Sequence, residues 1–382
     1  MNSFTFSVPL EVAAGKGSIN RLPEMVQKLG GKHAYFISGP RLNKMGIVKK
    51  YMDLLAEAGI PADAFTETES NPSVETVEKA AAGFKKSGAD CIIALGGGSP
   101  MDVAKAVGVV AKYGGSITEY EGSDKVPGEI IPLIAVPTTA GTGSEVTAFS
   151  VITDTKRAYK LSVFSYKLIP SYAILDPDLV TTAPASVAAA CGIDAMIHAL
   201  EAYLSTAASP FSDAMAEKAL ELIGSNIRRY VARRTDEEAA FAMLTGSLFA
   251  GIAFSWARLG NVHAMSHPVS AVFHVSHGVA NAILLPVIVE YNALADKGRY
   301  YEIYHYISRN PVKREDFYPE MLVEEIRKLN QDLGIPSSLS AVGVTEDAIG
   351  KMAEDAMKSG NIAVNPRSST QKEIEELYRK AI

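Results

Sequence analysis

The chain has 382 residues, of which 47% are hydrophobic and 21% charged, as in ordinary globular proteins, and this length favours two domains. The 37 basic and 43 acidic side chains give a net charge of −6, and neither sign forms a run, so we expect no nucleic-acid or membrane partner. No apolar run reaches the roughly 18 residues of a spanning helix, the N-terminus lacks a secretory signal, and two cysteines make no disulfide framework. We therefore expect a soluble, cytoplasmic protein.

The first half of the chain alternates between short β-rich runs and amphipathic stretches. The expected elements are, in chain order, a strand over 33–38, helices over 42–58 and 73–86, and strands over 91–95 and 131–136. Strands that alternate with helices predict a largely parallel sheet. After residue 181 the sequence becomes rich in Ala, Leu, Met and Glu, which favours helices. We therefore predict an α/β domain over 1–181 and an all-α domain over 182–382.

Two loops that follow expected strands carry the residues of a nucleotide site. The strand at 91–95 runs into Gly96-Gly97-Gly98-Ser99 and then into an expected helix. Glycines let the backbone approach a pyrophosphate closely, and a helix N-terminus attracts its charge. The strand at 131–136 is followed by PTTAGTGSE at 137–145, which offers hydroxyl donors. Because parallel strands end at one edge of the sheet, the two loops favour a nucleotide site over a tight turn and a solvent-exposed Ser/Thr loop.

Histidines and an aspartate predict a metal site in the second half. Four of the seven histidines fall within 15 residues: His263, His267, His274 and His277. Asp194 and His198 are one helical turn apart in an otherwise apolar stretch. They could form a hydrogen-bonded core pair, but a second histidine cluster favours a metal held by Asp194, His198 and two later histidines. Such ligands suit Fe²⁺, Zn²⁺, Co²⁺ or Mn²⁺, with iron or zinc expected first.

These motifs resemble those of the iron-dependent (group III) alcohol dehydrogenases. The likeness covers essentially the whole chain and includes GGGSPMDVAK at 96–105, PTTAGTGSE at 137–145, GIDAMIHALEAY at 192–203, HAMSHP at 263–268, HGVANAILLP at 277–286 and NPR at 365–367. The resemblance implies an N-terminal dinucleotide-binding α/β domain and a helical C-terminal domain, the architecture also found in dehydroquinate synthase. It also implies Fe²⁺ or Zn²⁺ and NADP or NAD as cofactors, and a homodimer or higher homo-oligomer.

The resemblance assigns roles to individual positions. The positions that match the family's metal ligands are Asp194, His198, His263 and His277. Those that match its cofactor contacts are Asn71, Gly97, Gly98, Ser99, Asp102, Thr138, Thr139, Thr142 and Lys160. His267 matches an unligated histidine near the metal. We expect His267 to be the catalytic proton relay, the alternative being that it only orients a ligand.

The implied reaction is hydride transfer between NAD(P)H and a small aldehyde or primary alcohol. The metal would bind the substrate oxygen as a Lewis acid. Glycerol dehydrogenase and dehydroquinate synthase resemble this architecture and provide a second possibility. A third is a non-catalytic sensor of metal and nucleotide, because binding residues alone do not prove turnover.

Three departures from the family pattern bear on the substrate. Trp256 and Arg258 stand where the family commonly has Asn and Gly, and His274 stands where uncharged residues are frequent. With Phe254, Arg258 and His274 form the expected substrate-binding set. Added positive charge favours a small aldehyde that bears an anionic group, unless Arg258 faces solvent or a subunit contact.

Gly39 bears on the choice of nucleotide. It follows the first expected strand, where members that prefer NAD often carry an Asp that repels a 2′-phosphate. Without that carboxylate we expect NADPH to be accepted in preference to NADH, with Arg41 or Lys44 as candidates to reach the phosphate. The alternative is that Gly39 serves only a tight turn before Pro40.

Overall fold

The computed structural model describes residues 6–157 and 159–382, which divide into two compact units. One unit comprises 7–139 and 143–182, and the other comprises Phe6, 140–142 and 183–382. The segment 140–142 is grouped with the helices because Gly141 packs on helix α7 (Ala185–Leu204). A Cβ atom added at Gly141 would lie only 2.7 Å from Cys191 Cβ.

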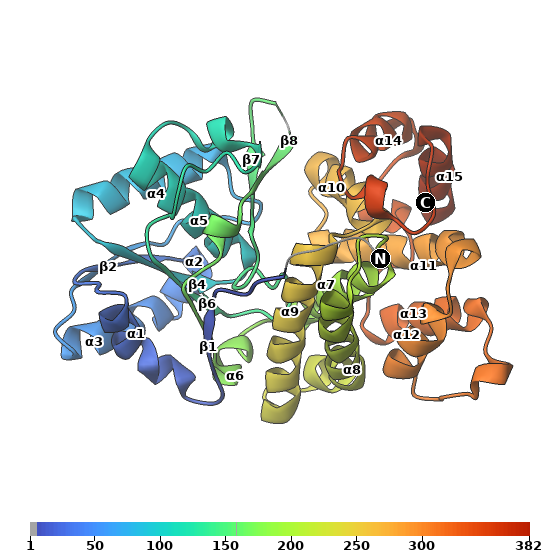
Figure 1. Ribbon diagram of the computed structural model, residues 1–382, viewed down its shortest axis with the longest axis horizontal. Helices are drawn as coiled ribbons and strands as arrows, with labels where there is room; N and C mark the ends of the chain where they lie inside the picture. The colour runs from blue at the N-terminus through green and yellow to red at the C-terminus, as the bar shows by residue number, and fades with distance from the viewer. Residues whose placement is uncertain (1–5, 158) are drawn as a thin grey trace. The chain divides into compact units, whose positions relative to one another are not determined.

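A six-stranded parallel sheet forms the centre of the first unit, in the order β1-β9-β6-β4-β2-β3 (Figure 1). Its strands are β1 (Glu11–Ala14), β2 (Ala34–Ile37), β3 (Ala62–Phe65), β4 (Cys91–Gly96), β6 (Leu133–Pro137) and β9 (Tyr172–Leu175). Its helices are α1 (Leu22–Lys28), α2 (Pro40–Lys44), α3 (Ile47–Glu57), α4 (Val74–Ser87), α5 (Gly98–Tyr113) and α6 (Pro177–Val180).

Helices cover both faces of this sheet. In β2, Tyr35 and Ile37 join the hydrophobic cluster under α4 and α5, whereas Phe36 joins the cluster under α1 and α3. Burial on both faces explains why the central strands are continuous apolar runs rather than alternating ones. The predicted α/β class is confirmed.

The expected elements of this unit are observed with one difference. The strands expected at 33–38, 91–95 and 131–136 are β2, β4 and β6, and the helix expected at 73–86 is α4, whose first turn is capped by Ser73. The helix expected at 42–58 is instead two helices, α2 and α3. Gly46 separates them with φ of 74°, a left-handed conformation that interrupts a helix.

A second, small sheet was not expected from the sequence. It comprises β5 (Gly122–Ser123), β7 (Phe149–Asp154) and β8 (Tyr159–Phe164), with β8 in the middle and β7 antiparallel to it. Lys160, one of the expected cofactor residues, lies on β8.

The described residues of the second unit form helices and their connections, with no strand among them. Its helices are α7, α8 (Pro210–Ala232), α9 (Glu237–Ala257), α10 (Asn261–Phe273), α11 (His277–Asn292), α12 (Arg299–Ile307), α13 (Pro319–Asp332), α14 (Ile349–Met357) and α15 (Gln371–Ala381). No segment long enough to span a membrane was expected from the sequence, but three segments, α7, α9 and 277–295, are long and apolar enough by length and composition. Most of each is buried in the structure, at 83%, 72% and 61% of its apolar window, so these segments form much of the unit's core.

Candidate metal centre and nucleotide-binding loops

Three helices bring the expected metal ligands together within the helical unit. Asp194 and His198 lie one turn apart on α7, His263 lies in the first turn of α10, and His277 begins α11. Gly278 lets α11 approach α7 closely, because a Cβ there would lie 2.1 Å from the carbonyl oxygen of Ala190. A glycine beside His277 is therefore a packing requirement of the site.

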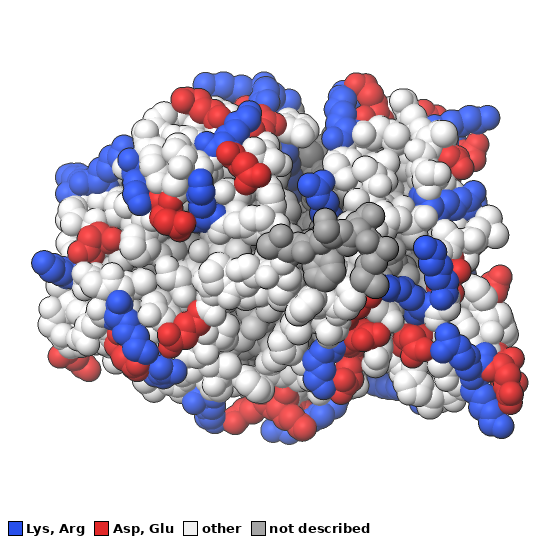
Figure 2. Space-filling model, in the orientation of Figure 1, with Lys and Arg blue, Asp and Glu red and all other residues white. Residues whose placement is uncertain are grey.

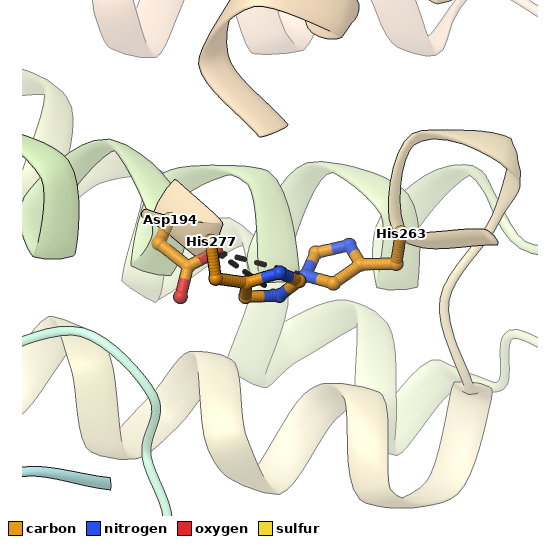
Figure 3. A group of neighbouring side chains, drawn as sticks. All are labelled: Asp194, His263 and His277. Atoms are coloured by element: carbon orange, nitrogen blue, oxygen red, sulfur yellow. Dashed lines mark ion pairs between the residues drawn. The ribbon is translucent and has the colours of Figure 1, made fainter. Parts of the chain in front are cut away.

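Asp194, His263 and His277 point toward one another (Figure 3). Their ligand atoms all lie within 4.8 Å of one another. Asp194 Oδ1 lies 3.7 Å from His263 Nε2 and 4.0 Å from His277 Nε2. A carboxylate oxygen and two imidazole nitrogens at these separations could hold one transition-metal ion.

His198, the fourth expected ligand, lies outside that group of three but packs directly against it. Its ring stacks on the ring of His263 with centroids 4.6 Å apart. Its Nδ1 lies 3.3 Å from the carbonyl oxygen of Gly141, so Nδ1 carries the proton in the neutral ring and Nε2 keeps its lone pair. The ring is thus in the tautomer that a ligand at Nε2 needs.

The electrostatics of the cluster fit a bound cation. Burial opposes ionisation of Asp194, but His198, His263 and His277 hold its pKa well below the usual range. Burial lowers the pKa of His198 to about 4. Burial also disfavours a charged His263, yet hydrogen bonds with Asp194 and Glu201 raise its pKa to about 9. A charged carboxylate beside a neutral imidazole is what a metal ion requires, and the positive charge at His263 is one that a cation would replace.

Two polar residues of the cluster, Glu201 and Asn281, were not singled out in the sequence analysis. Glu201, on α7, accepts hydrogen bonds from His263 Nδ1 at 2.6 Å and from the backbone N–H of Val262 at 2.7 Å. Asn281, on α11, places Nδ2 2.6 Å from Asp194 Oδ1 and 3.1 Å from Nε2 of both His263 and His277. Glu201 Oε2 and Asn281 Nδ2 therefore contact the expected ligands directly.

The closing NPR motif supports the same helix. Asn365 Oδ1 accepts a hydrogen bond from the backbone N–H of Asn261, the first residue of α10. It also accepts one from Asn292 Nδ2 at 3.2 Å. Asn365 therefore caps the first turn of α10.

The expected catalytic and substrate residues lie around the cluster. His267 is partly exposed and stacks on His277, with ring centroids 5.2 Å apart. Phe254 is buried and stacks on His198 at 4.6 Å. Arg258 and His274 are exposed at the ends of α9 and α10, and both have positive φ, 61° and 56°. Histidine adopts the left-handed conformation of His274 more readily than most side chains, whereas the φ and ψ of Arg258, 61° and −173°, are nearly restricted to glycine.

The glycine turn and the start of the threonine loop, residues 137–139, lie side by side in the α/β unit. Gly96 is paired with Pro137 across β4 and β6, and the N–H of Thr138 donates to the Gly96 carbonyl at 2.9 Å. The side chain of Thr139 lies 2.9 Å from the position of a Cβ at Gly97. Gly97, Gly98 and Ser99 are partly exposed at the start of α5, as a phosphate site requires. Thr142 belongs to the helical unit.

Three other expected cofactor residues, Asn71, Asp102 and Lys160, make hydrogen bonds within the α/β unit. Lys160 Nζ donates to Asn71 Oδ1 at 2.8 Å, and Asn71 has a positive φ of 54°. Asp102 accepts hydrogen bonds from Ser144 Oγ and from the N–H of Val151. Burial raises the pKa of Asp102 to about 6.

Lys105 is a further residue that the sequence did not single out. Its side chain is fully buried, and Nζ donates to Ser144 Oγ, to Thr147 Oγ1 and to the carbonyl oxygens of Thr147 and Phe149. Lys105 therefore ties α5 to the segment that follows the threonine loop.

Gly39 lies two residues after β2 and is the N-cap residue of α2, at the carboxyl edge of the sheet. A Cβ there would lie 3.2 Å from the carbonyl oxygen of Thr68. Of the two side chains considered for a 2′-phosphate, Arg41 donates to the carbonyl oxygen of Thr182. Lys44 is exposed near the end of α2.

The charged side chains on the face drawn in Figure 2 are of mixed sign. Lysine and arginine are interspersed with aspartate and glutamate rather than gathered into one basic surface. The face shown thus lacks the basic stripe expected of a surface that follows a phosphate backbone.

Comparison with known proteins places both units in one family. Residues 9–177 match the model described as iron-containing alcohol dehydrogenase, and residues 188–382 match the C-terminal model of the Fe-containing alcohol dehydrogenase family. A 1,3-propanediol dehydrogenase of Citrobacter freundii is 39% identical over 99% of this chain and 98% of its own length.

Solved structures agree along the full chain. A crystal structure of 1,3-propanediol oxidoreductase matches with a TM-score of 0.96 and 38% identity, covering 100% of both chains. A sulfoacetaldehyde reductase from Bifidobacterium kashiwanohense, in complex with NAD⁺, matches with a TM-score of 0.90 and 28% identity over 100% of this chain and 99% of its own.

Proposed function

This chain belongs to the iron-containing alcohol dehydrogenase family and is an oxidoreductase that acts on CH–OH groups, and we propose how its residues do so. In this proposal Asp194, His198, His263 and His277 hold Fe²⁺ or Zn²⁺ at the reaction centre. The observation that carries it is the convergence of three ligand atoms within 4.8 Å, in a cluster whose carboxylate is buried. The substrates are small aldehydes and primary alcohols.

The residues around the cluster have distinct tasks in the reaction. When bound, the cation supplies Lewis acidity toward the substrate oxygen, and the nicotinamide supplies or accepts the hydride. Phe254, packed on His198, forms an apolar border that excludes water from the reacting carbon. His267 is stacked on His277 and partly exposed, so it can pass a proton between the substrate oxygen and solvent.

The α/β unit binds the nucleotide in this proposal. The exposed amides of Gly97, Gly98 and Ser99 at the start of α5 receive the pyrophosphate, and Thr138 and Thr139 line the adjoining loop. Gly39 leaves no carboxylate at the end of β2, which favours NADPH over NADH.

The metal assignment is tested by removing one ligand. His277→Ala should lose bound metal together with activity, because its Nε2 is one of the three convergent ligand atoms. His305→Ala is the matched control, since His305 is exposed on α12 of the same unit. Full metal occupancy in His277→Ala, measured by elemental analysis, would refute the assignment.

Product analysis separates the proposed reaction from those of similar architectures. An alcohol dehydrogenase consumes NAD(P)H in a one-to-one ratio with the aldehyde, whereas a dehydroquinate synthase-like enzyme shows no net change in cofactor absorbance. A sensor would bind nucleotide and metal without turnover. We expect stoichiometric oxidation of NADPH in an anaerobic aldehyde panel with Fe²⁺ or Zn²⁺ added.

A finer proposal is that the aldehyde bears an anionic group. Arg258 follows Phe254 by one turn, and its guanidinium has no hydrogen bond or ion pair with a described residue. Its φ of 61° and ψ of −173° belong to a region nearly restricted to glycine, so this arginine is kept at a cost in backbone energy. The similarity to a protein named sulfoacetaldehyde reductase adds support.

Catalytic efficiency on charged and uncharged substrates tests the finer proposal. We expect succinic semialdehyde or phosphonoacetaldehyde to be preferred over propanal, and Arg258→Gly to lose that preference while gaining a relaxed backbone. A preference for propanal that Arg258→Gly leaves unchanged would exclude an anion-binding role. The metal assignment would stand in that case.

A further inference from the structure

We propose that Glu201 is a positioning residue of the metal centre, which fixes His263 and supplies the second buried negative charge that a divalent cation neutralises. The proposal rests on the proposed metal-dependent function. Glu201 is 5% exposed and lies on α7, where Asp194, His198 and Glu201 follow one another at spacings of four and three residues. The three side chains therefore share one face of the helix.

One carboxylate holds both the backbone and the ring at the start of α10. Glu201 Oε1 accepts the N–H of Val262, which as a first-turn amide has no partner within its own helix. Glu201 Oε2 accepts Nδ1–H of His263 at 2.6 Å. The N-cap residue of α10 is Gly260, which has no side chain to accept the Val262 N–H.

Gly260 makes room for this contact. A Cβ at Gly260 would lie 2.9 Å from Glu201 Oε1. Asn365 Oδ1 lies as near, at 2.8 Å, so the positions of both side chains depend on the glycine before α10. Their packing sets where α10 begins relative to α7, and so where His263 points.

The contact with Nδ1 selects the tautomer of His263. With its proton on Nδ1 and donated to Glu201, the neutral ring keeps a lone pair on Nε2, which lies 3.7 Å from Asp194 Oδ1. A carboxylate that orients a ligating histidine in this way commonly contributes 10- to 100-fold in metal affinity, as an order of magnitude.

Glu201 also completes the charge of the site. Asp194 and Glu201 are both buried, and among the described residues their ion-pair partners are histidines alone, with no lysine or arginine. The two carboxylates carry a charge of −2, which balances a divalent cation while the three imidazoles stay neutral. Without Glu201 the loaded site would carry an uncompensated buried charge, which is costly.

Glutamine at this position is the informative substitution, because it has the size of glutamate but only one acceptor atom. Two N–H donors, from Val262 and His263, meet the carboxylate, so the amide NH₂ of Glu201→Gln must face one of them. If it faces His263, the ring must move its proton to Nε2, and that nitrogen can no longer ligate. Glu201→Ala removes both acceptors.

Asn365→Ala is the matched structural control. Asn365 accepts the N–H of Asn261 in the same first turn of α10 and contacts His263 in no hydrogen bond. It should therefore lower the melting temperature of the metal-free protein without changing the tautomer of His263. Glu201→Gln should instead act on metal binding.

The experiment measures dissociation constants for Zn²⁺ and Co²⁺ by competition with a chelator, the visible absorption spectrum of the Co²⁺ protein, and the melting temperature without metal. We expect Glu201→Gln to bind both ions 10- to 100-fold more weakly than the unmodified protein and to show a changed Co²⁺ spectrum, with Asn365→Ala near the unmodified values. Unmodified constants and spectrum in Glu201→Gln, with a lowered melting temperature as in Asn365→Ala, would reduce Glu201 to a helix cap and overturn the proposal.

The unmodified protein and His277→Ala distinguish the two levels of the proposal. If the unmodified protein binds neither ion, the metal-dependent function fails and the role of Glu201 fails with it. If His277→Ala loses the ions but Glu201→Gln retains them fully, only the role of Glu201 is refuted.

Discussion

Gly278 offers the sharpest test of how the fold positions the metal ligands. In Gly278→Ala the new Cβ would lie 2.1 Å from the carbonyl oxygen of Ala190 and 2.7 Å from its carbonyl carbon. These are backbone atoms of α7 that cannot rotate away. Restoring an ordinary contact of about 3.4 Å requires α11 and α7 to separate by roughly 1.3 Å at this point.

That separation acts directly on the site, because His277 precedes Gly278 and Asp194 lies one turn after Ala190. Metal–ligand distances tolerate only about 0.2 Å. We therefore expect Gly278→Ala to weaken Zn²⁺ binding at least about tenfold, and the overpacking to lower the free energy of unfolding by about 1–3 kcal/mol. Gly278 has no positive φ, so the predicted loss comes from the steric clash and not from backbone strain at the new alanine.

Chelator competition and thermal unfolding of the metal-free protein measure the two effects. Gly350→Ala is the control, because Gly350 lies in α14 and an added Cβ there meets nothing within 4 Å. That variant should be stabilised by roughly 0.5–1 kcal/mol and should bind Zn²⁺ normally. Unaltered Zn²⁺ affinity and melting temperature in Gly278→Ala would show that α7 and α11 are not in the tight contact on which this reasoning depends.

Two further predictions concern the α/β unit. Gly39→Asp should shift catalytic efficiency from NADPH toward NADH, because the new carboxylate repels the 2′-phosphate. Gly39→Ala places the same Cβ 3.2 Å from Thr68 O and should not shift it. Equal catalytic efficiency with NADPH in the unmodified protein and both variants would contradict this. Lys105→Met leaves the Asp102 and Glu145 carboxyl groups without their buried cation, so we expect a loss of about 3–5 kcal/mol in stability and a raised KM for NADPH. Its metal content should stay unchanged because the ligands lie in the other unit, and an unaltered melting temperature would speak against the network.

The parallel sheet could be predicted because its strands are buried on both faces and therefore read as uninterrupted apolar runs between helices. The hairpin of β7 and β8 could not be predicted in this way. Residues of β7 alternate between buried and partly buried, and the third strand of this sheet, β5, has two residues, so the apolar signal of the hairpin is diluted. The break between α2 and α3 depends on the left-handed φ of Gly46, which an isolated glycine in a helical pattern does not reveal.

The ligands of the metal centre could be predicted from the sequence, whereas the residues that orient them could not. Asp194, His198 and two later histidines could be proposed because metal ligands are restricted to a few residue types and tend to occur at helical spacings. The resemblance to the family then identified the two histidines as His263 and His277. Glu201 and Asn281 were not predicted because each contacts a residue on another helix. Glu201 contacts His263, and Asn281 contacts Asp194. A signal for Glu201 was nevertheless present, since a third polar residue on the apolar face of α7 needs a buried partner of its own.

Backbone strain gives an independent indication of where function lies. Among the described residues, four other than glycine have positive φ, namely Asn71, Asp124, Arg258 and His274. Three of these four had been singled out from the sequence as cofactor or substrate residues, on grounds unrelated to backbone geometry. Asn, Asp and His adopt positive φ more readily than other side chains, so the strain is greatest at Arg258, whose φ of 61° and ψ of −173° suit glycine. We propose that the Arg258 side chain is retained there for its positive charge, which the comparison of charged and uncharged aldehydes with Arg258→Gly tests.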